Sequence, residues 1–552
     1  MAADLVIFNA RVRPLFAPLG TTAVAVTGGR IAALGTDAEI RSHAGPGTRM
    51  LDADGRELMP GFIESHLHLF MGGATLSMLN LGEAFGFEAV EAAFDAYIRA
   101  NPGNDILFGY AVNYTIFGEN RRPDRHLLDD ICRDRPLCLI ATDLHCAWAN
   151  TRALELAGIL QGAELGRESE VVMGDDGLAT GELREFEAMN RVKMLSRLKG
   201  RDGLDFTGLD DIPQEDRSHD RALIRRAGTY CAQNGITHAV NMDGNPYQAG
   251  LMRDLAQAGE MPVRVSLPLK LVESDGPEGV ARIELFGEEV PDWLSFGRIK
   301  LFMDGVYDTW TALTVTDYPD RPGFRSGPLI APEIFNAICT EADRRGLQVA
   351  THAVGDGAVR AAIDGYEAAA RANGTRDARH RIEHIDTIAP EDLERLKPLG
   401  IVASMQPVHP PGSAGLPLEP TISIMGRARW DTAFPWRMIS QRGVPLAFGT
   451  DWPVSPLSPL HAIHCALTRE PWAKDAPDQR ISLDDCLMAY TAGGAYADFC
   501  DERRGALKSG LDADFVLIDG DLERLADSAE AATVALTICN GEITYEAENE
   551  RH

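Results

Sequence analysis

Residues 60–70 read PGFIESHLHLF. An apolar run that begins after a Pro-Gly pair is typical of a buried strand, and this one ends in polar groups. His66 and His68 are two residues apart, so on an extended strand both imidazoles point to one face and can bind the same ion. Taken alone, such a pair is more often two ordinary hydrogen-bonded histidines. The rest of the chain has to decide between these interpretations.

Seven further strand-like segments alternate with helical patterns along the chain. This alternation predicts βαβ units with a parallel sheet, and eight units predict an α/β fold of the closed (β/α)8 TIM barrel type. The eight expected strands are 58–66, 236–242, 263–269, 298–303, 348–352, 381–385, 401–406 and 445–451. The helices expected between them include 220–233, 332–345, 358–372 and 390–396.

The gap between the first and second expected strands is too long for one connection, so an insertion of about 72–215 is expected there. Loops at that end of a barrel usually cover the active site and select the substrate. Both chain ends contain short strand-like segments, and neither end supplies enough strands for a stable sheet. We therefore predict a small composite β-sandwich from 1–58 and 505–552, beside a barrel domain of 59–504.

Composition narrows the classes of partner. The 552 residues carry a net charge of −29 without a basic cluster, which argues against binding to nucleic acid or to a membrane surface. The nine cysteines are scattered and none is spaced as CxxC, which argues against a disulfide framework and a structural zinc module. The chain shows neither a secretory signal nor a spanning apolar run, so we expect a cytoplasmic protein. A small-molecule substrate is the expected partner, and a homodimer is left open.

The fourth expected strand, RIKLFMDG at 298–305, places a lysine on its inner face. Its alternation puts Ile299 and Leu301 on the face that packs against helices, so Lys300 points inward. Burial lowers the pKa of an amine toward the neutral form, which can react with carbon dioxide to give a carbamate able to bridge two metals. From this segment alone, a lysine paired with an acid such as Asp304 is the favoured alternative.

Three more expected strands end in candidate ligands. His352 closes VATHAVGD and His384 closes RIEHID, each as readily structural as ligating when taken alone. In PLAFGTDWPV, Asp451 shares its face with the small residues Ala447 and Gly449, so its carboxylate points inward. An inward carboxylate without a cation would be costly. Together with the first and fourth strands, these residues predict a metal site on the carboxyl face of the barrel.

Motifs along almost the whole chain resemble the amidohydrolase superfamily, specifically the YtcJ-like amidohydrolases that include N-substituted formamide deformylases. The segments that carry the resemblance are NARVRPL, AVTGGRIAALG, LMPGFIESHLH, KLFMDGV, THAVGDGA, HRIEHID, SMQPVHP, FGTDWPV and GLDADFVLIDGD. The family usually has aspartate at the position of Glu64, which is not a ligand. The segment DGVYDTWTALT departs from a glycine-serine-arginine run in relatives, which bears on the substrate.

The resemblance implies a ligand set for one or two divalent ions. Imidazole and carboxylate ligands with open positions suit catalytic zinc. The implied ligands are His66 and His68 for the first ion, His352 and His384 for the second, carboxylated Lys300 as the bridge, and Asp451 for the first ion and for proton transfer.

Other residues are candidates for contacts with the substrate. His145, within the insertion, and His409, after MQPVHP, match positions where relatives have histidine near the substrate, and His145 is a candidate catalytic residue. Arg381 is a candidate substrate contact that alternatively orients an acid or the strand, and Trp310 alternatively packs. Glu182 and Glu185 are expected at a solvated helix start.

The expected reaction is hydrolysis of a carbon–nitrogen amide-type bond other than a peptide bond. A metal-bound hydroxide would attack the carbonyl, and Asp451 would pass its proton to the leaving amine as general acid and base. An isomerase or lyase on the same barrel is the first alternative. A non-catalytic binding or regulatory protein is the second, disfavoured because all six ligands are present.

Overall fold

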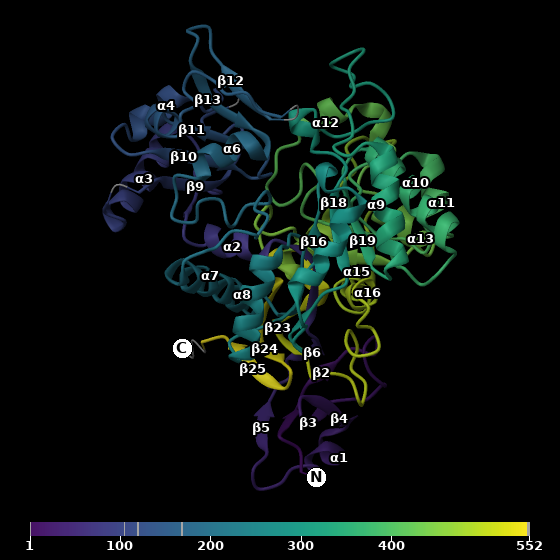
Figure 1. The fold of residues 1–552 in the computed structure, drawn as a ribbon. Coiled ribbons are helices and arrows are strands. Elements are labelled where there is room, and N and C mark those ends of the chain that lie inside the picture. The colour runs from purple at the N-terminus through teal and green to yellow at the C-terminus, as the bar shows by residue number, and fades with distance from the viewer. Residues whose placement is uncertain (1, 104, 119–120, 167–168, 549–552) are drawn as a thin grey trace. The chain divides into compact units, whose positions relative to one another are not determined.

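The structure is a computed structural model that describes residues 2–103, 105–118, 121–166 and 169–548. It is a mixed α/β protein (Figure 1), and its chain divides into two compact units. The first unit comprises Met1–Leu69, Gly228–Trp452 and Pro456–His552, and the second comprises Phe70–Ala227 with Pro453–Ser455. Among the described residues, no helix is long and apolar enough to cross a bilayer.

The first unit contains two parallel sheets. Their orders are β17-β15-β14-β7 and β16-β18-β19-β20-β21-β22, and every neighbouring pair runs parallel. The strands are β7 (Phe62–Leu67), β14 (Ile236–Asn241), β15 (Arg264–Ser266), β16 (Leu269–Lys270), β17 (Leu294–Ser295), β18 (Arg298–Phe302), β19 (Gln348–Ala353), β20 (Arg381–His384), β21 (Val402–Met405) and β22 (Leu446–Phe448). Most of their residues are buried, as expected for strands covered on both faces.

The first expected strand, 58–66, is two strands rather than one. Its first part is β6 (Glu57–Pro60), which pairs antiparallel with β23, while β7 pairs parallel with β14. Gly61 separates them, and its N–H donates to the carbonyl of Asp514, at 3.0 Å. The chain therefore passes between two sheets within a few residues.

The third expected strand, 263–269, is also interrupted. Pro268 lies between β15 and β16, and proline has no N–H to donate to a neighbouring strand. The other expected barrel strands agree with the observed ones to within a few residues at each end.

Strands from both chain ends combine in one sheet of the first unit. The five-stranded sheet has the order β2-β6-β23-β24-β25, and in Figure 1 its C-terminal strands (yellow) lie beside β6 and β2 (purple). A separate four-stranded sheet has the order β4-β3-β1-β5. The strands are β1 (Leu5–Phe8), β2 (Arg11–Val12), β3 (Ala23–Thr27), β4 (Arg30–Gly35), β5 (Arg49–Asp52), β23 (Phe515–Gly520), β24 (Ala532–Cys539) and β25 (Glu542–Glu546).

Helices of the first unit follow its parallel strands. The pair α9 (Pro332–Arg344) and α10 (Asp356–Asn373) pack on each other, and each buries an apolar stripe. The remaining helices are α1 (Asp37–Arg41), α8 (Pro246–Gln257), α11 (Pro390–Leu396), α12 (Thr421–Met425), α13 (Trp436–Gln441), α14 (Pro459–Thr468), α15 (Leu483–Ala489) and α16 (Ala492–Ala497).

The second unit is built on its own six-stranded sheet, and the expected insertion, 72–215, falls within this unit. The sheet order is β12-β13-β11-β10-β9-β8, with parallel and antiparallel pairs. Its strands are β8 (Leu79–Asn80), β9 (Leu107–Val112), β10 (Leu137–Ala141), β11 (Cys146–Ala149), β12 (Glu170–Met173) and β13 (Ala179–Arg184). Its helices are α3 (Phe87–Ala100), α4 (Arg125–Ile131), α5 (Thr151–Leu156) and α6 (Glu185–Lys193). Two helices include residues of both units, namely α2 (Leu69–Thr75) and α7 (Gln214–Gln233).

A buried arginine joins the parallel strands to the terminal sheet. Arg264, at the start of β15, donates to both carboxylate oxygens of Asp514, at 2.8 and 2.9 Å, and to the side chain of Asn540. Its guanidinium is 1% exposed, so it has exchanged water for these partners. The pair therefore links residues that are 250 positions apart.

We predict that Arg264→Met lowers the free energy of unfolding by roughly 3–5 kcal/mol, because it leaves the buried Asp514 carboxylate without its main cation. Arg371→Met is the matched control, since Arg371 is 71% exposed and pairs with Glu367 at 3.6 Å on α10. That control should change stability by less than about 0.5 kcal/mol. Denaturant titration measures both, and equal effects would contradict the structural role of Arg264.

Candidate metal centre

The expected metal ligands of the first unit lie at the carboxyl ends of five parallel strands. His66 is in β7 and His68 directly follows it, Lys300 is in β18, and His352 is in β19. His384 is the last residue of β20, and Asp451 follows β22 by three residues. All six side chains are buried. Rigid strands therefore bring together residues that are up to 385 positions apart in the chain.

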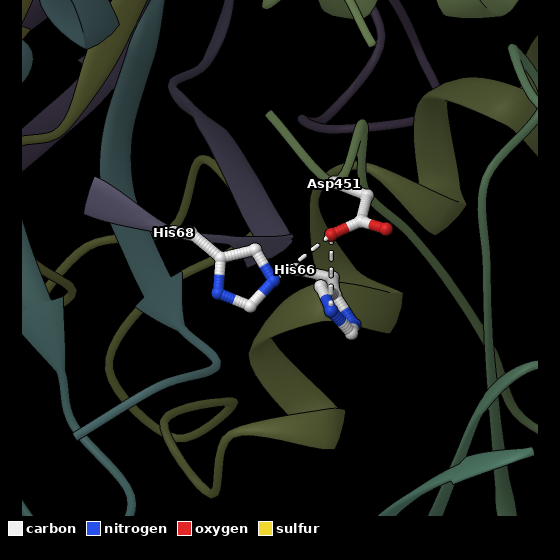
Figure 2. A group of neighbouring side chains, drawn as sticks. All are labelled: His66, His68 and Asp451. Carbon is white, nitrogen blue, oxygen red and sulfur yellow. Dashed lines mark ion pairs between the residues drawn. The ribbon is translucent and has the colours of Figure 1, made fainter. Parts of the chain in front are cut away.

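Asp451 joins the two histidines of the first strand. Its Oδ1 lies 3.3 Å from Nε2 of His66 and 3.2 Å from Nε2 of His68, as the dashed lines in Figure 2 show. The three ligand atoms lie within 4.8 Å of one another. This is a compact set of two imidazoles and one carboxylate, the ligand types that zinc prefers.

Burial and charge act differently on these three groups. Burial and the nearby Lys300 charge lower the pKa of His66 to about 4. Burial also opposes protonation of His68, but its bond to Asp243 and the nearby Asp451 carboxylate raise its pKa to about 9. Burial favours the neutral carboxyl of Asp451, but the nearby imidazoles of His66 and His68 outweigh burial and hold the pKa of Asp451 below its usual range. A proton on His68 thus supplies the cation that the carboxylate requires, a place that a metal ion could take.

Lys300 is fully buried, and within the described part of the chain its Nζ has no hydrogen-bond partner. Its expected alternative partner, Asp304, instead accepts backbone N–H groups from Val354, Gly355 and Leu313. Burial lowers the pKa of Lys300 to about 8. The ammonium lies 4.7 Å from the ring of Phe302, which compensates little of the lost hydration. The amine is therefore poised toward its neutral form.

The histidines of β19 and β20 lie beside this group. The ring of His384 is 4.8 Å from that of His66 and 4.5 Å from that of His352. His352 stacks on Phe302, and its Nε2 lies 3.3 Å from the carbonyl of Gly305. The strands thus bring four histidines together.

His409 joins the same cluster from the loop after β21. Its ring stacks on His384 at 5.8 Å, and its Nε2 lies 3.8 Å from Oδ2 of Asp451. Ligand atoms of His384, His409 and Asp451 lie within 4.8 Å of one another. The structure therefore places His409 beside the candidate ligands, and its proposed substrate contact stays a prediction.

Arg381 lies beneath the ligands, where it orients an acid. It is fully buried and donates to both carboxylate oxygens of Glu383, at 2.8 and 3.0 Å, to the carbonyl of Ser65 and to Ser404. Glu383 in turn bonds Nδ1 of His66 at 2.7 Å. This placement matches the alternative role expected for Arg381, and its proposed substrate contact stays a prediction.

Trp310 is half-buried in the loop that follows β18. Its Nε1 donates to Asp320 at 2.9 Å, and the guanidinium of Arg321 stacks 3.6 Å above its ring. Its φ of 59° lies in the left-handed region, which is uncommon for a bulky residue. The loop itself therefore engages both the ring and the polar tip of Trp310, and a substrate contact stays a prediction.

The turn before Asp451 is held tightly against β7. Glu64 accepts the backbone N–H of Thr450 at 2.6 Å, and burial raises the pKa of Glu64 to about 8. A Cβ at Gly449 would lie 2.6 Å from the backbone nitrogen of His66, so only glycine fits there. Asp451 has a φ of 60°, a strained value for a non-glycine residue. Close packing of this kind fixes the carboxylate in place.

A second group with metal-ligand residue types is His238, Asp498 and Cys500. Two arginines already occupy it, since Arg298 pairs with Asp498 and Arg504 lies 3.0 Å from Nδ1 of His238. Burial raises the pKa of the Cys500 thiol to about 12, so the thiolate that a metal requires is disfavoured. We interpret this group as a structural network.

His145 belongs to the second unit, where it forms a buried dyad with Glu185. Nδ1 of His145 lies 2.7 Å from Oε2 of Glu185, and the backbone N–H of Glu185 donates to the carbonyl of His145. Leu144 and Glu185 both have φ near 60°, in the left-handed region. Strained backbone on either side of a buried His–Glu pair is typical of a functional position.

The expectation that Glu182 and Glu185 form a solvated helix start is wrong. Both are 7% exposed. Glu182 lies in β13, where it pairs with Arg184, and α6 begins only at Glu185. Acidic residues are typical of the first turn of a helix, which is why the sequence suggested exposed side chains. Sequence does not show that β13 pairs with β11 or that Glu185 bonds His145.

Several supporting residues escaped the sequence analysis, namely Glu383, Asp243, Gln406 and the partner role of Glu185. Each bonds a histidine from another strand or loop, so sequence spacing gives no sign of the pair. The only available signal was a polar residue near the end of an expected strand, as for Asp243 after β14 and Glu383 within β20.

The fold brings residues of metal-ligand types together at the carboxyl ends of parallel strands. The chain belongs to the Amidohydrolase family, whose model matches residues 49–545. The resemblance inferred from the motifs, to the amidohydrolase superfamily and its YtcJ-like members, is confirmed.

Individual relatives match nearly the whole chain. It is 30% identical to the protein LONG AFTER FAR-RED 3 of Arabidopsis thaliana, over 99% of this chain and 92% of that protein. It is 26% identical to an N-substituted formamide deformylase of Arthrobacter pascens, over 98% of each. A solved structure of an uncharacterized metal-dependent hydrolase from Pyrococcus horikoshii has a TM-score of 0.72, covering 95% of this chain and 99% of that one at 22% identity. That likeness shows a shared fold.

We predict that His145→Ala impairs turnover or substrate affinity while metal content stays unchanged. Glu185→Gln should have a smaller effect in the same direction, because it keeps a hydrogen-bond acceptor but removes the charge that orients the imidazole. Steady-state kinetics and elemental analysis measure the two properties. Arg152→Met is a matched control, since its side chain is 46% exposed on α5 of the same unit. Unchanged kinetics in both variants would make the dyad purely structural.

Proposed function

We propose that this protein is a metal-dependent hydrolase that cleaves a carbon–nitrogen amide-type bond, other than a peptide bond, in a small molecule. One observation carries the proposal. His66, His68 and Asp451 place three ligand atoms within 4.8 Å of one another, with Lys300, His352 and His384 at neighbouring strand ends. Buried groups of this kind are costly to hold together unless a cation compensates them.

The residues present fit a divalent ion. In the described part of the chain, Nε2 of His66, Nζ of Lys300 and Oδ1 of Asp451 are buried without a hydrogen bond. Nδ1 of His66 is bonded to Glu383, so its Nε2 carries the lone pair and faces another acceptor at 3.3 Å. A cation between two acceptors removes that repulsion. We assign His66, His68 and Asp451 to a first ion and His352 and His384 to a second, with zinc as the metal that suits these ligands.

We further propose that the two parallel sheets form one closed (β/α)8 barrel. Residues Leu67 and Trp452 form a parallel bridge between the end of β7 and the segment after β22, which supports closure at one seam. At the other seam, β15 and β16 belong to one continuous segment interrupted at Pro268. The pairing of β6 with β23 supports a composite sandwich from the two chain ends.

The two oxygens of Asp451 face different groups, which suggests separate tasks. A bound divalent ion would acidify a water molecule and polarise the carbonyl of the substrate. Oδ1 of Asp451 faces His66 and His68, so we assign it to the ion. Oδ2 faces His384 and His409 at 3.9 and 3.8 Å, and we assign it to the proton that leaves the water and later reaches the amine. His409 would hold this oxygen in position.

The proposed bond class rests on the relatives. A 26% identical relative over almost the full length carries the name N-substituted formamide deformylase, which supports a carbon–nitrogen bond for this chain. An isomerase or lyase on the same site is the alternative, since one fold supports many reactions. Hydrolysis must place solvent oxygen in the acid that is released together with the amine, whereas isomerisation and elimination do not.

The test is a screen of the metal-loaded protein against N-acyl and N-formyl compounds in water labelled with oxygen-18. We predict that the oxygen-18 label appears in the acid product and that chelation of the metal abolishes activity. In Asp451→Asn, we predict a kcat that is roughly 10²- to 10⁴-fold lower, which is the contribution expected of a general acid–base group. Asparagine keeps the size of the side chain but accepts no proton. Asp386→Asn is the matched control, because the Asp386 carboxyl lies near enough to Asp451 to be influenced by its charge, and the proposed proton route does not use it.

Activity that survives complete removal of metal would overturn the proposed function. A product without solvent oxygen would favour the isomerase or lyase. Near-normal turnover in metal-loaded Asp451→Asn would reject the proton route alone.

Carboxylation of Lys300 gives a separate prediction. With a pKa of about 8, roughly 10% of the amine is neutral at pH 7, against ~0.03% for an ordinary lysine. The neutral nitrogen can bond to the carbon of carbon dioxide and release a proton, and the resulting carbamate shares one negative charge between two oxygens. We expect a carbamate signal by NMR after incubation with zinc and carbon-13 bicarbonate.

Lys300→Ala should remove that signal, whereas Lys270→Met should keep it. Lys270 is the fitting control because it also lies near Phe302, at 5.5 Å, but is only partly buried. A fully metal-loaded protein with an unmodified Lys300 would refute the carbamate.

A further inference from the structure

Three histidines of the centre have Nδ1 bonded to an acceptor of the chain itself. His66 bonds Glu383 and His68 bonds Asp243, both at 2.7 Å, through Nδ1 to a carboxylate oxygen. His384 bonds Gln406 at 2.9 Å, through Nδ1 to an amide oxygen. In each case Nδ1 carries the proton, and Nε2 is the atom that can bind an ion. The three histidines share one geometry but differ in the charge of the acceptor.

The two carboxylate acceptors are themselves held in place. Glu383 is fully buried and receives two hydrogen bonds from Arg381, which is anchored in turn by Ser404. Asp243 is 2% exposed, and its second oxygen accepts from Nε2 of Gln248 at 2.7 Å. Both carboxylates are thus fixed in the orientation that the imidazoles require. A fixed, charged acceptor strengthens the imidazole as a ligand, because it stabilises positive charge that the ring acquires on binding a cation.

The neutral acceptors lie on the other side of the centre. Gln406, in the segment after β21, offers an amide oxygen to His384. Nε2 of His352 lies 3.3 Å from the neutral backbone carbonyl of Gly305 and 3.7 Å from Oδ1 of Asp304, a carboxylate that already accepts three backbone N–H groups. The acceptors therefore differ between strands: His66 in β7 and His68 directly after it each bond a carboxylate through Nδ1 at 2.7 Å, whereas His384 at the end of β20 bonds an amide oxygen.

We propose that the two ion positions of the centre differ in affinity because of these acceptors. The position at His66, His68 and Asp451 binds a divalent ion more tightly, by a factor on the order of 100, than the position at His352 and His384. Glu383 and Asp243 are the positioning residues of the tight position, and Gln406 is that of the weak one. The proposal rests on the proposed metal-dependent function and adds the order in which the ions bind.

The first test is titration of the chelator-stripped protein with Zn²⁺ against a competing chromogenic chelator. We expect two steps whose dissociation constants differ by about 100-fold. Crystals supplied with less than one equivalent of Zn²⁺ should show anomalous density at His66, His68 and Asp451. Density at His352 and His384 under those conditions, or two steps of equal affinity, would overturn the proposal.

The second test exchanges the acceptors. Glu383→Gln keeps the shape of the side chain but removes its charge, and it should weaken the first step by about 10- to 100-fold while the second step changes less. Gln406→Glu adds a negative charge beside His384 and should lower the dissociation constant of the second step. The difference between the two dissociation constants should then become smaller. Glu394→Gln is the isosteric control, since its side chain is 70% exposed and pairs with Arg442 at the surface. It should change neither step.

Failure of the metal-dependent function and failure of the affinity difference give different results in these experiments. A protein that binds no divalent ion at all would overturn the metal-dependent function itself. Two ions bound with unchanged affinities in Glu383→Gln and Gln406→Glu would leave that function standing and overturn only the role of the acceptors. If Glu383→Gln does not fold, Asp243→Asn tests the same position, because Asp243 makes the equivalent bond to His68.

Discussion

Oδ1 of Asp451 lies within 3.3 Å of Nε2 of both His66 and His68, and the centre of the first unit depends on this contact. A buried carboxylate needs a cation, and here that cation is either a proton on an imidazole or a metal ion. The surrounding backbone is adapted to hold the carboxylate in place. Glu64 bonds the residue before Asp451, and Gly449 allows the close approach of two strands. The chain accepts a left-handed φ at Asp451, a conformation that persists only where its surroundings enforce it.

The site could be predicted from sequence where a residue's direction follows from strand periodicity. His66, Lys300 and Asp451 each lie on a strand or just beyond its end, and alternation alone indicates that they point inward. The strands themselves were predictable to within a few residues, because long apolar segments with helices between them give a strong signal. The breaks at Gly61 and Pro268 were not predicted. Each depends on how neighbouring sheets meet, which local pattern does not contain.

Partners of the ligands could not be predicted for a related reason. Glu383 and His66 are 317 positions apart, and only the order of strands brings them together. The same applies to Glu185 in the second unit, whose acidic neighbours suggested a solvated helix start. In the structure the helix does begin at Glu185, but its carboxylate turns to His145 and is buried. The sequence shows that the residue is acidic, but only the tertiary structure decides whether its carboxylate is solvated or bonded to an imidazole.

Lys300 shows why the supporting residues matter as much as the ligands. Its amine is buried among groups of both signs, since the carboxylates of Glu383 and Asp451 favour its charge while Arg381 opposes it. Burial outweighs these charges and moves the pKa to about 8. Arg381 therefore acts on two parts of the centre at once. It orients Glu383 toward His66, and its positive charge lowers the pKa of Lys300. One buried guanidinium thereby acts on His66 of β7 through Glu383 and on Lys300 of β18 through its charge.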